Sequence, residues 1–450
     1  MNPRSLLLVA GGTLAAGAVA AAVVTRGTPA AQVILTMDGE SRVGPDSVRV
    51  ALFLRALESG DAILCEMVAD QLGNFWWSGD EANLGRFADA GPRMLAARDS
   101  LSGSVTDPGA IRLLRAALST DQPCVRRVAA KMLGRGRANA VGLADLLGHP
   151  EPRVREAAAY AAGSADRHDL RLALEARLTD RAVDAAVMAA WALGQIEERA
   201  SLDPLARAAR SGTPRLRLAA VWALGEIEDP EAVPTVTPAL RDDDALVRAT
   251  AARALGQIES RRATEPLQEA LRDSDARVRA AAAEALGQIE DERAAESLEQ
   301  LLRRDPVAAV REASAHALGQ IALARSAEAL GMAVEDPERR VRYAAVEAMA
   351  DLDDLTRAPA PLLRAIGSDD AGLKRRAAET LAEIADPSTV PVLIPLLNDP
   401  DPELRARVVD ALGEIGTRET IPGLLRGLKD SDPEVRRVAA DALGEVEKRR

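Results

Sequence analysis

The feature that most constrains this chain is an apolar segment of twelve residues that recurs at nearly constant intervals. Residues 278–289 read VRAAAAEALGQI, and residues 247–258, which lie 31 positions earlier, read VRATAARALGQI. Related segments begin at Val125, Val154, Ala185, Leu216, Val247, Val278, Val310, Val341, Leu373, Leu404 and Val435. The interval between successive segments is 29 to 32 residues, a period that is typical of proteins built from stacked structural repeats.

Each segment has the pattern of an amphipathic helix. Positions 1, 5, 8, 9 and 12 are apolar, and they share one face when successive residues turn by about 100°. The residues Asp432, Pro433 and Glu434 before Val435 supply an N-cap, a proline at the first helical position and an acid in the first turn. Stretches such as IPGLLRGL at 421–428, which lie between segments, predict a second helix in every period.

A helix of this kind cannot bury its apolar face alone, whereas stacked helical hairpins build one continuous core. We therefore predict an all-α fold, a right-handed α-solenoid of about eleven hairpins with a period of 31 residues over residues 107–450. The composition agrees, because 47% of the residues are hydrophobic but only 2% are aromatic. Much of the apolar content must therefore be alanine, and alanine-rich helices can pack closely together.

The capped start and the AADALGEV end of residues 432–446 resemble HEAT repeats, in particular the short class of phycobilin-lyase-type proteins. The resemblance implies HEAT-like hairpins over residues 107–450, but such repeats serve many unrelated functions. It also implies a structural ladder in which the arginine at position 2, such as Arg248, pairs with the aspartate four residues earlier, such as Asp244. The alternative for residues 242–244 is a calcium site.

The first 31 residues have the composition of an export signal. Arg4 provides a positive charge, residues 6–24 are uncharged, and small residues surround Ala30 and Ala31. An uncleaved membrane anchor is the alternative, because 19 uncharged residues almost span a bilayer. Both interpretations predict an extracytoplasmic location, either periplasmic or secreted, or anchored through this segment.

Residues 32–106 follow the period less well, and we predict that they form degenerate helical repeats that cap the solenoid. A small separate helical domain is the alternative. The aromatic residues Phe75, Trp76 and Trp77 either close the end of the core or contact a membrane or a partner. Regular stacking would place Cys65 and Cys124 about two repeats apart, so we expect two separate thiols rather than a disulfide.

The sequence predicts a protein without catalytic residues, cofactor or metal. None of its three histidines, His149, His168 and His316, is followed by glutamate, so the His-Glu pairs that bind iron in HEAT-repeat deoxyhypusine hydroxylases are missing. The sequence also contains no glycine-rich phosphate loop, nucleophile elbow or paired CxxC motif. Nucleic acid is not an expected partner, because a net charge of −12 repels a phosphate backbone.

Positions 3, 7 and 11 of the segments point away from the core and are the expected binding surface. By analogy with HEAT solenoids, these helices line the concave side. Three successive segments carry an aromatic residue at position 7, and aliphatic residues flank them at position 3. The predicted anchor site for a partner consists of Tyr160, Trp191, Trp222, Val187 and Leu218, continued by Arg253. The alternative is that the rings fold down and pack between neighbouring helices.

The last four segments carry acids at positions 7 and 11. These residues are Glu347, Asp351, Glu379, Glu383, Asp410, Glu414, Asp441 and Glu445. Like charges four residues apart disfavour an isolated helix, so their presence favours a partner with a basic surface. The alternative is a solvated face on an acidic protein.

Together these features predict an exported, non-enzymatic scaffold or adaptor that holds a protein or peptide on its concave surface. The alternatives are an accessory or enzyme of the bilin-lyase or hydroxylase type, and a regulatory module of a membrane protease or receptor. Contact with a membrane is expected only through an uncleaved N-terminal anchor.

Overall fold

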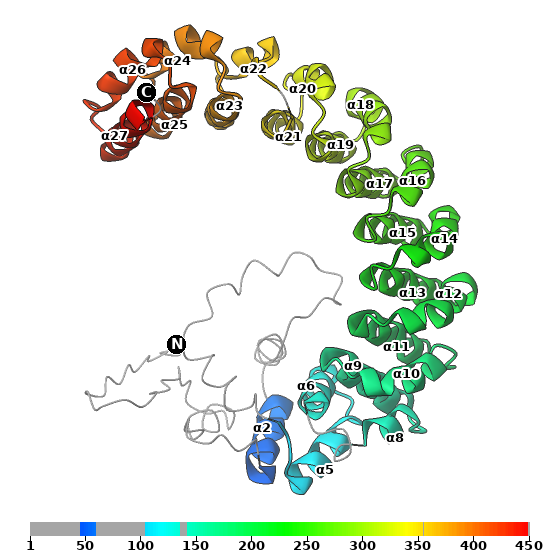
Figure 1. Ribbon diagram of the computed structural model, residues 1–450. Helices are drawn as coiled ribbons and strands as arrows, with labels where there is room; N and C mark the ends of the chain where they lie inside the picture. Colours follow the sequence, from blue (N-terminus) through cyan, green and yellow to red (C-terminus); the bar gives the residue numbers. More distant parts are fainter. Residues whose placement is uncertain (1–45, 60–103, 136–141, 354, 449–450) are drawn as a thin grey trace, which may run out of the picture. The chain divides into compact units, whose positions relative to one another are not determined.

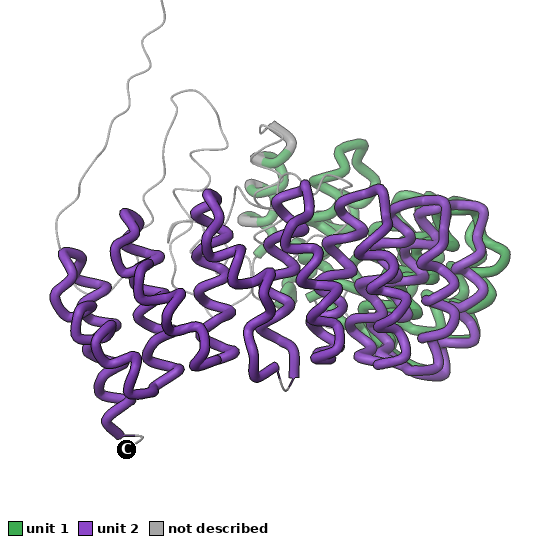
Figure 2. Tube along the Cα trace, turned by 90° about the horizontal axis from the view of Figure 1, so that it is seen from above, with its two compact units in different colours: residues 1–227 green, residues 228–450 purple. Residues whose placement is uncertain are grey.

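The computed structural model describes residues 46–59, 104–135, 142–353 and 355–448, and all regular structure in these ranges is helical. The proposed leader (1–31), most of the proposed cap and the aromatic residues at 75–77 lie outside the described residues. None of the described helices is long and apolar enough to cross a membrane. The chain forms two compact units, residues 1–227 and 228–450 (Figures 1 and 2).

Unit 1 alternates helices of two kinds, which we call short and long helices. The described helices are α2 (Ser47–Ser59), α5 (Pro108–Ala117), α6 (Pro123–Gly134), α8 (Leu143–Leu147), α9 (Pro152–Ser164), α10 (Arg171–Arg177), α11 (Val183–Ile196), α12 (Leu202–Ser211) and α13 (Pro214–Glu226). The long helices α6, α9, α11 and α13 contain the recurring segments and pack in sequence against one another, with the short helices α8, α10 and α12 on one side (Figure 1).

Unit 2 continues the same alternation. Its long helices are α15 (Ala245–Gln257), α17 (Ala276–Ile289), α19 (Ala308–Ile321), α21 (Arg339–Ala350), α23 (Ala371–Ile384), α25 (Pro402–Ile415) and α27 (Pro433–Lys448). Its short helices are α14 (Val233–Val236), α16 (Thr264–Ala270), α18 (Ala295–Arg304), α20 (Ala327–Ala333), α22 (Ala360–Ala365), α24 (Val390–Leu396) and α26 (Ile421–Gly427). Within this unit, the long helices lie on the inner side of the curve and the short helices on the outer side (Figure 1).

The ends of the long helices follow local chemistry. Asp432 is an N-cap, as predicted, and so are Asp244 and Asp275; each accepts a hydrogen bond of 2.8 to 2.9 Å from the backbone N–H two residues later. The first or second residue after a long helix often adopts the left-handed conformation that favours glycine. Glu259 and Glu290 both have a φ of 52° there. This non-glycine cap was not expected from the sequence, because glutamate seldom adopts this conformation.

The core lies between the two rows of helices and between neighbouring long helices. The leucine at position 9 is completely buried in every long helix from α11 to α19. The glycine at position 10 lets the next long helix approach closely: a Cβ atom at Gly287 would lie 2.8 Å from the Cα atom of Ala317. The predicted all-α architecture of packed helical hairpins is therefore confirmed.

The predicted ladder exists, but its pairing is different. Arg248 does not pair with Asp244; its guanidinium donates two hydrogen bonds, of 2.7 and 2.9 Å, to the carboxylate of Asp273 in the next turn. A third N–H group donates to the carbonyl oxygen of Asp242. The same link occurs in Arg155–Asp180, Arg279–Asp305, Arg311–Asp336, Lys374–Asp399 and Arg405–Asp430. The arginine is long enough to cross to the following hairpin, so the ladder connects successive repeats.

Candidate partner-binding surfaces

The aromatic residues of unit 1 form a stack along its long helices. The rings of Tyr160 and Trp191 are stacked, with centroids 5.4 Å apart and planes 22° apart. The Trp191 ring also lies over Gly163 of α9, where its Cζ3 atom would be 2.8 Å from a Cβ atom. Trp222 lies over Gly194 of α11 in the same way, at 2.9 Å. Each indole thus folds back onto the preceding long helix, because glycine leaves room for the ring.

This arrangement corrects the prediction of an exposed strip. Only 7% of Tyr160 and 2% of Val187 are exposed, so both residues belong mainly to the core. Trp191, Trp222 and Leu218 are half-buried, and they keep part of their apolar surface accessible. The alternative of rings packed between neighbouring helices is therefore confirmed for Tyr160. Arg253, which lies in unit 2, is exposed as expected, and binding of a partner at these residues stays a prediction.

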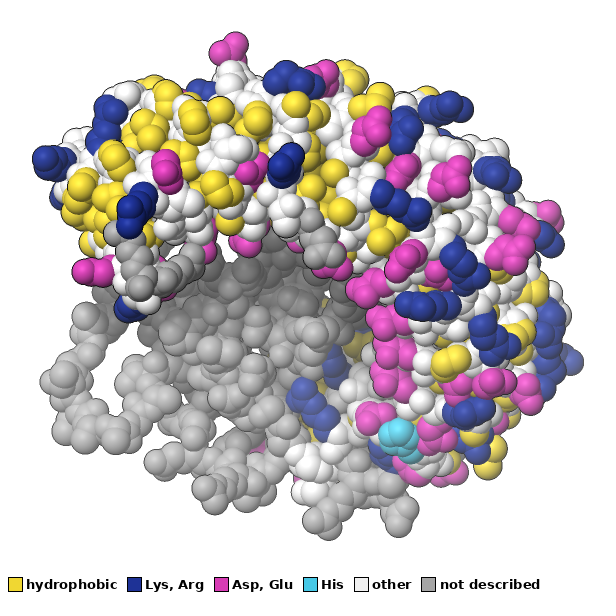
Figure 3. Space-filling view, turned by 45° about the horizontal axis from the view of Figure 1, so that its top comes forward, with side chains coloured by type: hydrophobic (Ala, Val, Ile, Leu, Met, Phe, Trp, Pro, Cys, Tyr) yellow, Lys and Arg dark blue, Asp and Glu magenta, His cyan; other side chains and the backbone are white. Residues whose placement is uncertain are grey.

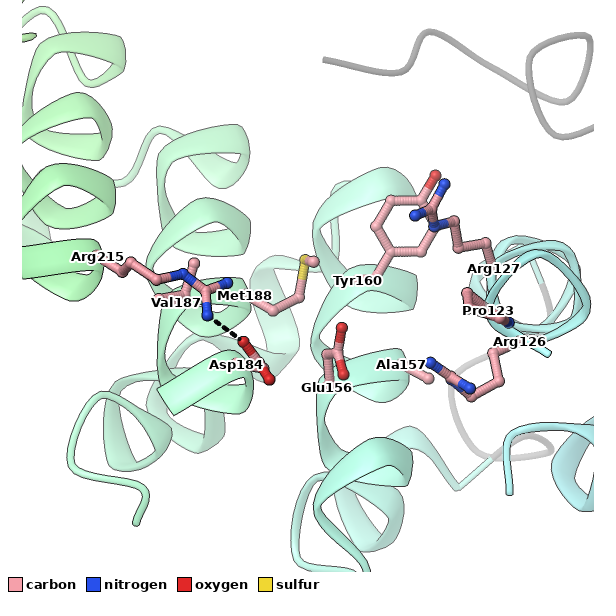
Figure 4. A pocket seen from close by; sticks show the side chains of 10 residues that line it. All are labelled: Pro123, Arg126, Arg127, Glu156, Ala157, Tyr160, Asp184, Val187, Met188 and Arg215. Carbon is pink, nitrogen blue, oxygen red and sulfur yellow. Dashed lines mark ion pairs between the residues drawn. The ribbon is translucent and has the colours of Figure 1, made fainter. Parts of the chain in front are cut away.

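A pocket of about 250 Å³ opens beside this stack (Figure 4). We call it the unit 1 pocket. Its lining residues come from α6, α9, α11 and α13 and are Pro123, Arg126, Arg127, Glu156, Ala157, Tyr160, Asp184, Val187, Met188 and Arg215. Two predicted site residues, Tyr160 and Val187, therefore line a pocket rather than an open strip.

The charges in the unit 1 pocket are arranged around Glu156. Asp184 forms an ion pair of 2.7 Å with Arg215, and Arg126 donates a hydrogen bond of 2.8 Å to the carbonyl oxygen of Thr120. Glu156 forms no hydrogen bond or ion pair within the described residues. Burial raises the pKa of Glu156, and the nearby Asp184 carboxylate raises it further. Glu156 was not among the predicted site residues, although it occupies position 3, the same register as Val187 and Leu218.

The predicted acidic residues lie on the solvent side of the long helices of unit 2. Seven of the eight are exposed, and Glu347 is half-buried. Several are neutralised within the chain: Arg376 pairs with Glu347, Arg407 pairs with Glu379 at 3.0 Å, and Arg437 pairs with Asp441 at 2.7 Å. Internal pairing therefore lowers the charge available to a basic partner.

Asp410 is an exception among these acidic residues. The arginine at position 4 that pairs with Glu347 or Glu379 is replaced by Val438 in α27. Burial raises the pKa of Asp410, and the neighbouring Glu414 carboxylate raises it further. Among the described residues, Asp410 therefore has no ion pair that corresponds to those of Glu347 and Glu379.

A third surface, which the sequence analysis missed, covers the short helices of unit 2. Apolar side chains gather there (Figure 3). Met332 is 59% exposed and Leu425 is 50% exposed, and Val392 and Leu428 are also exposed. The apolar composition of short helices such as VPVLIPLL (390–397) indicates this surface in the sequence, but the predicted site residues were taken only from the long helices.

Cys124 is disulfide-bonded, so the expectation of a free thiol at this position is wrong. Cys65, the other cysteine of the sequence, lies outside the described residues. Among the described residues, no cluster of three or more His, Cys, Asp or Glu side chains is arranged to hold a metal ion.

These features define a class of proteins, the arrays of stacked helical hairpins. The family model of HEAT repeats matches residues 170–249, 233–319, 300–382 and 358–444, which together exceed half of the chain. The chain therefore belongs to the HEAT-repeat family, and its fold is a HEAT-type α-solenoid like that of importin. No curated protein matches this sequence.

Solved structures show the same fold at low sequence identity. Importin beta is 15% identical, with a TM-score of 0.53 over 92% of this chain and 61% of its own. Kap95p, in a structure with RanGDP, is 15% identical, with a TM-score of 0.51 over 93% of this chain and 60% of its own. The CpcE–CpcF complex of phycocyanin lyase from Nostoc sp. PCC7120 is 25% identical over 55% of this chain and 94% of its own, but its TM-score of 0.33 is too low to bear on the fold.

Proposed function

We propose that this protein is an exported, non-enzymatic scaffold that holds a protein or peptide partner on its long helices. HEAT solenoids are in general protein-binding scaffolds, and Kap95p is described as binding RanGDP. The observation that carries the proposal is the set of half-buried apolar residues Trp191, Trp222 and Leu218 beside the unit 1 pocket. Large aromatic residues that pair a fixed ring with an accessible edge are typical anchors in protein interfaces.

Two observations support export. Residues 1–31 have the composition of a signal or anchor segment, and Cys124 is disulfide-bonded. Disulfides form and persist in oxidising compartments and are rare in the cytosol of most organisms. Fractionation of native cells, with the protein detected in the periplasm, the medium or the membrane, tests this part of the proposal.

The binding surface is best tested by a substitution that spares the stacked rings. Met188 is half-buried and lines the unit 1 pocket, whereas Met332 is exposed on the row of short helices. We expect Met188→Arg to abolish capture of partners from a native extract, because it places a long, positively charged side chain beside the anchor residues. Met332→Arg, the matched control, should leave capture intact. If only Met332→Arg abolishes capture, the partner binds the short helices and the proposed surface is wrong.

A further inference from the structure

The unit 1 pocket has the size of a site for one side chain. Its volume of about 250 Å³ lies below the range of roughly 300–1,000 Å³ that is usual for drug-sized ligands. Ala157, Val187, Met188 and the ring of Tyr160 provide apolar walls (Figure 4). A long side chain with an aliphatic stem and a polar end matches such a mixed lining.

Glu156 gives the pocket its chemical preference. Its carboxylate is half-buried and accepts no hydrogen bond within the described residues. A partly desolvated carboxylate without a donor is unfavourable, and a charged donor would relieve this cost with a short, strong hydrogen bond. The other carboxylate of the pocket, Asp184, is already paired with Arg215. Glu156 is therefore the acceptor that remains for an incoming group.

The arginines around the pocket do not take this role from Glu156. Arg126 is bound to the Thr120 carbonyl oxygen, and Arg215 is bound to Asp184. Together with Arg127 on α6, these guanidinium groups lower the pKa of Glu156, but burial and the Asp184 carboxylate raise it more. A carboxylate beside apolar walls can accept hydrogen bonds from the end of a basic side chain while the stem of that side chain packs on the walls.

We infer that the unit 1 pocket binds an arginine or lysine side chain of the partner, with Glu156 as the acceptor. The inference rests on the proposed function and deepens it, since it names the chemistry of the residue that is recognised at this site. The aliphatic stem of that side chain would lie against Met188 and Tyr160, and its cationic end would reach Glu156.

A peptide titration tests the inference without knowledge of the natural partner. The probe is a blocked pentapeptide, acetyl-Gly-Gly-Arg-Gly-Gly-amide, and the comparison peptides carry lysine, citrulline or glutamate in place of arginine. Trp191 is the reporter, because its ring stacks on Tyr160, which lines the pocket. Its indole N–H signal is followed by NMR in the full chain and assigned with Trp191→Phe.

We expect the arginine and lysine peptides to shift the indole signal and to bind at least about tenfold more tightly than the citrulline peptide. Glu156→Gln should remove this difference. Glu312→Gln is the matched control, because Glu312 is also a half-buried glutamate at position 3 but lies on α19 in unit 2. The Glu312→Gln variant should bind the arginine peptide as tightly as the unchanged protein does.

Three results would overturn the inference. The first is equal binding of the arginine and citrulline peptides, or no shift with any peptide at 10 mM probe, a concentration about tenfold above a 1 mM Kd. The second is preferential binding of the glutamate peptide, which would assign recognition to the arginines. The third is an equal loss of affinity in Glu156→Gln and Glu312→Gln, which would reflect net charge alone. Failure of this test leaves the capture experiment with Met188→Arg unaffected, so the two proposals can fail separately.

Discussion

Replacing Gly287 by alanine should destabilise the protein, although alanine is the better helix former. A Cβ atom at this position would lie 2.8 Å from the Cα atom and 3.1 Å from the Cβ atom of Ala317, and it would also contact Gln320. The glutamine side chain can move, but the α19 backbone must shift. Overpacking of this kind costs about 1–3 kcal/mol, and the higher helix propensity of alanine offsets about 1 kcal/mol. The net loss is therefore about 0–2 kcal/mol.

Gly444 offers a matched control, because it occupies the same position 10 in α27 and a Cβ atom there would meet nothing within 4 Å. Gly444→Ala should stabilise its helix by about 0.5–1 kcal/mol. The effects of the two substitutions on stability should thus differ by about 0.5–3 kcal/mol, with Gly444→Ala the more stable. Long repeat arrays need not unfold in a single step, so the free energy of local opening should be measured by native-state hydrogen exchange in α17, α19 and α27.

The reasoning fails if Gly287→Ala protects the amides of α17 as much as Gly444→Ala protects those of α27. That result would mean that the two long helices can separate without cost, and that glycine at position 10 is not required for their close approach. A loss of protection confined to α17 and α19, with α25 unchanged, would support both the close contact and the independence of distant repeats.

Further predictions concern pH and helix ends. The Arg405 guanidinium lowers the pKa of Asp430 to about 2. This link should therefore stabilise unit 2 above the ordinary aspartate pKa of about 4 and lose its effect as the pH falls towards 2. In Arg405→Gln, acid unfolding followed by circular dichroism should shift to higher pH. A hydrogen bond to the Glu198 carboxylate raises the pKa of His168. The contribution of this pair to stability should be complete below the ordinary histidine pKa of about 6.5 and disappear as the pH rises above the pKa of His168 in the folded protein. An NMR titration of the imidazole measures that pKa. Glu259→Gly should raise stability by up to about 1 kcal/mol in hydrogen exchange, because glycine adopts the left-handed conformation without strain, whereas Glu284→Gly within α17 should lower it by about 1 kcal/mol.

The sequence contained most of the information about the fold. The apolar positions of the segments, the Asp-Pro starts and the glycine at position 10 are local patterns, and each has the same physical role in every repeat. The left-handed conformation of Glu259 and Glu290 after the long helices was not predicted, because glutamate is not a residue type that favours this conformation. Repetition alone fixes where a helix must end, and the chain then accepts the strain of a glutamate there.

The candidate site was harder to predict because it depends on neighbours that are distant in sequence. In an isolated helix, position 7 places Tyr160 and Trp191 on the face opposite the apolar core positions. Whether a ring stays there depends on the space that the preceding helix leaves, which Gly163 provides for Trp191. The ladder was mispaired for the same reason, since Arg248 reaches Asp273 in the next hairpin rather than its near neighbour Asp244.

The ladder has a consequence for how a chain of this kind can change its length. In the six links described above, the arginine or lysine finds its aspartate in the following hairpin, 25 residues on in five cases and 26 residues on from Arg279, so the link tolerates one inserted residue. Duplication or loss of DNA that encodes whole periods would join the arginine of one copy to the aspartate of another without new chemistry at the junction. The array can therefore lengthen or shorten by unequal recombination while every internal junction keeps its ion pair, and natural selection is left to act on the few positions, such as Glu156 and Trp191, that differ between copies.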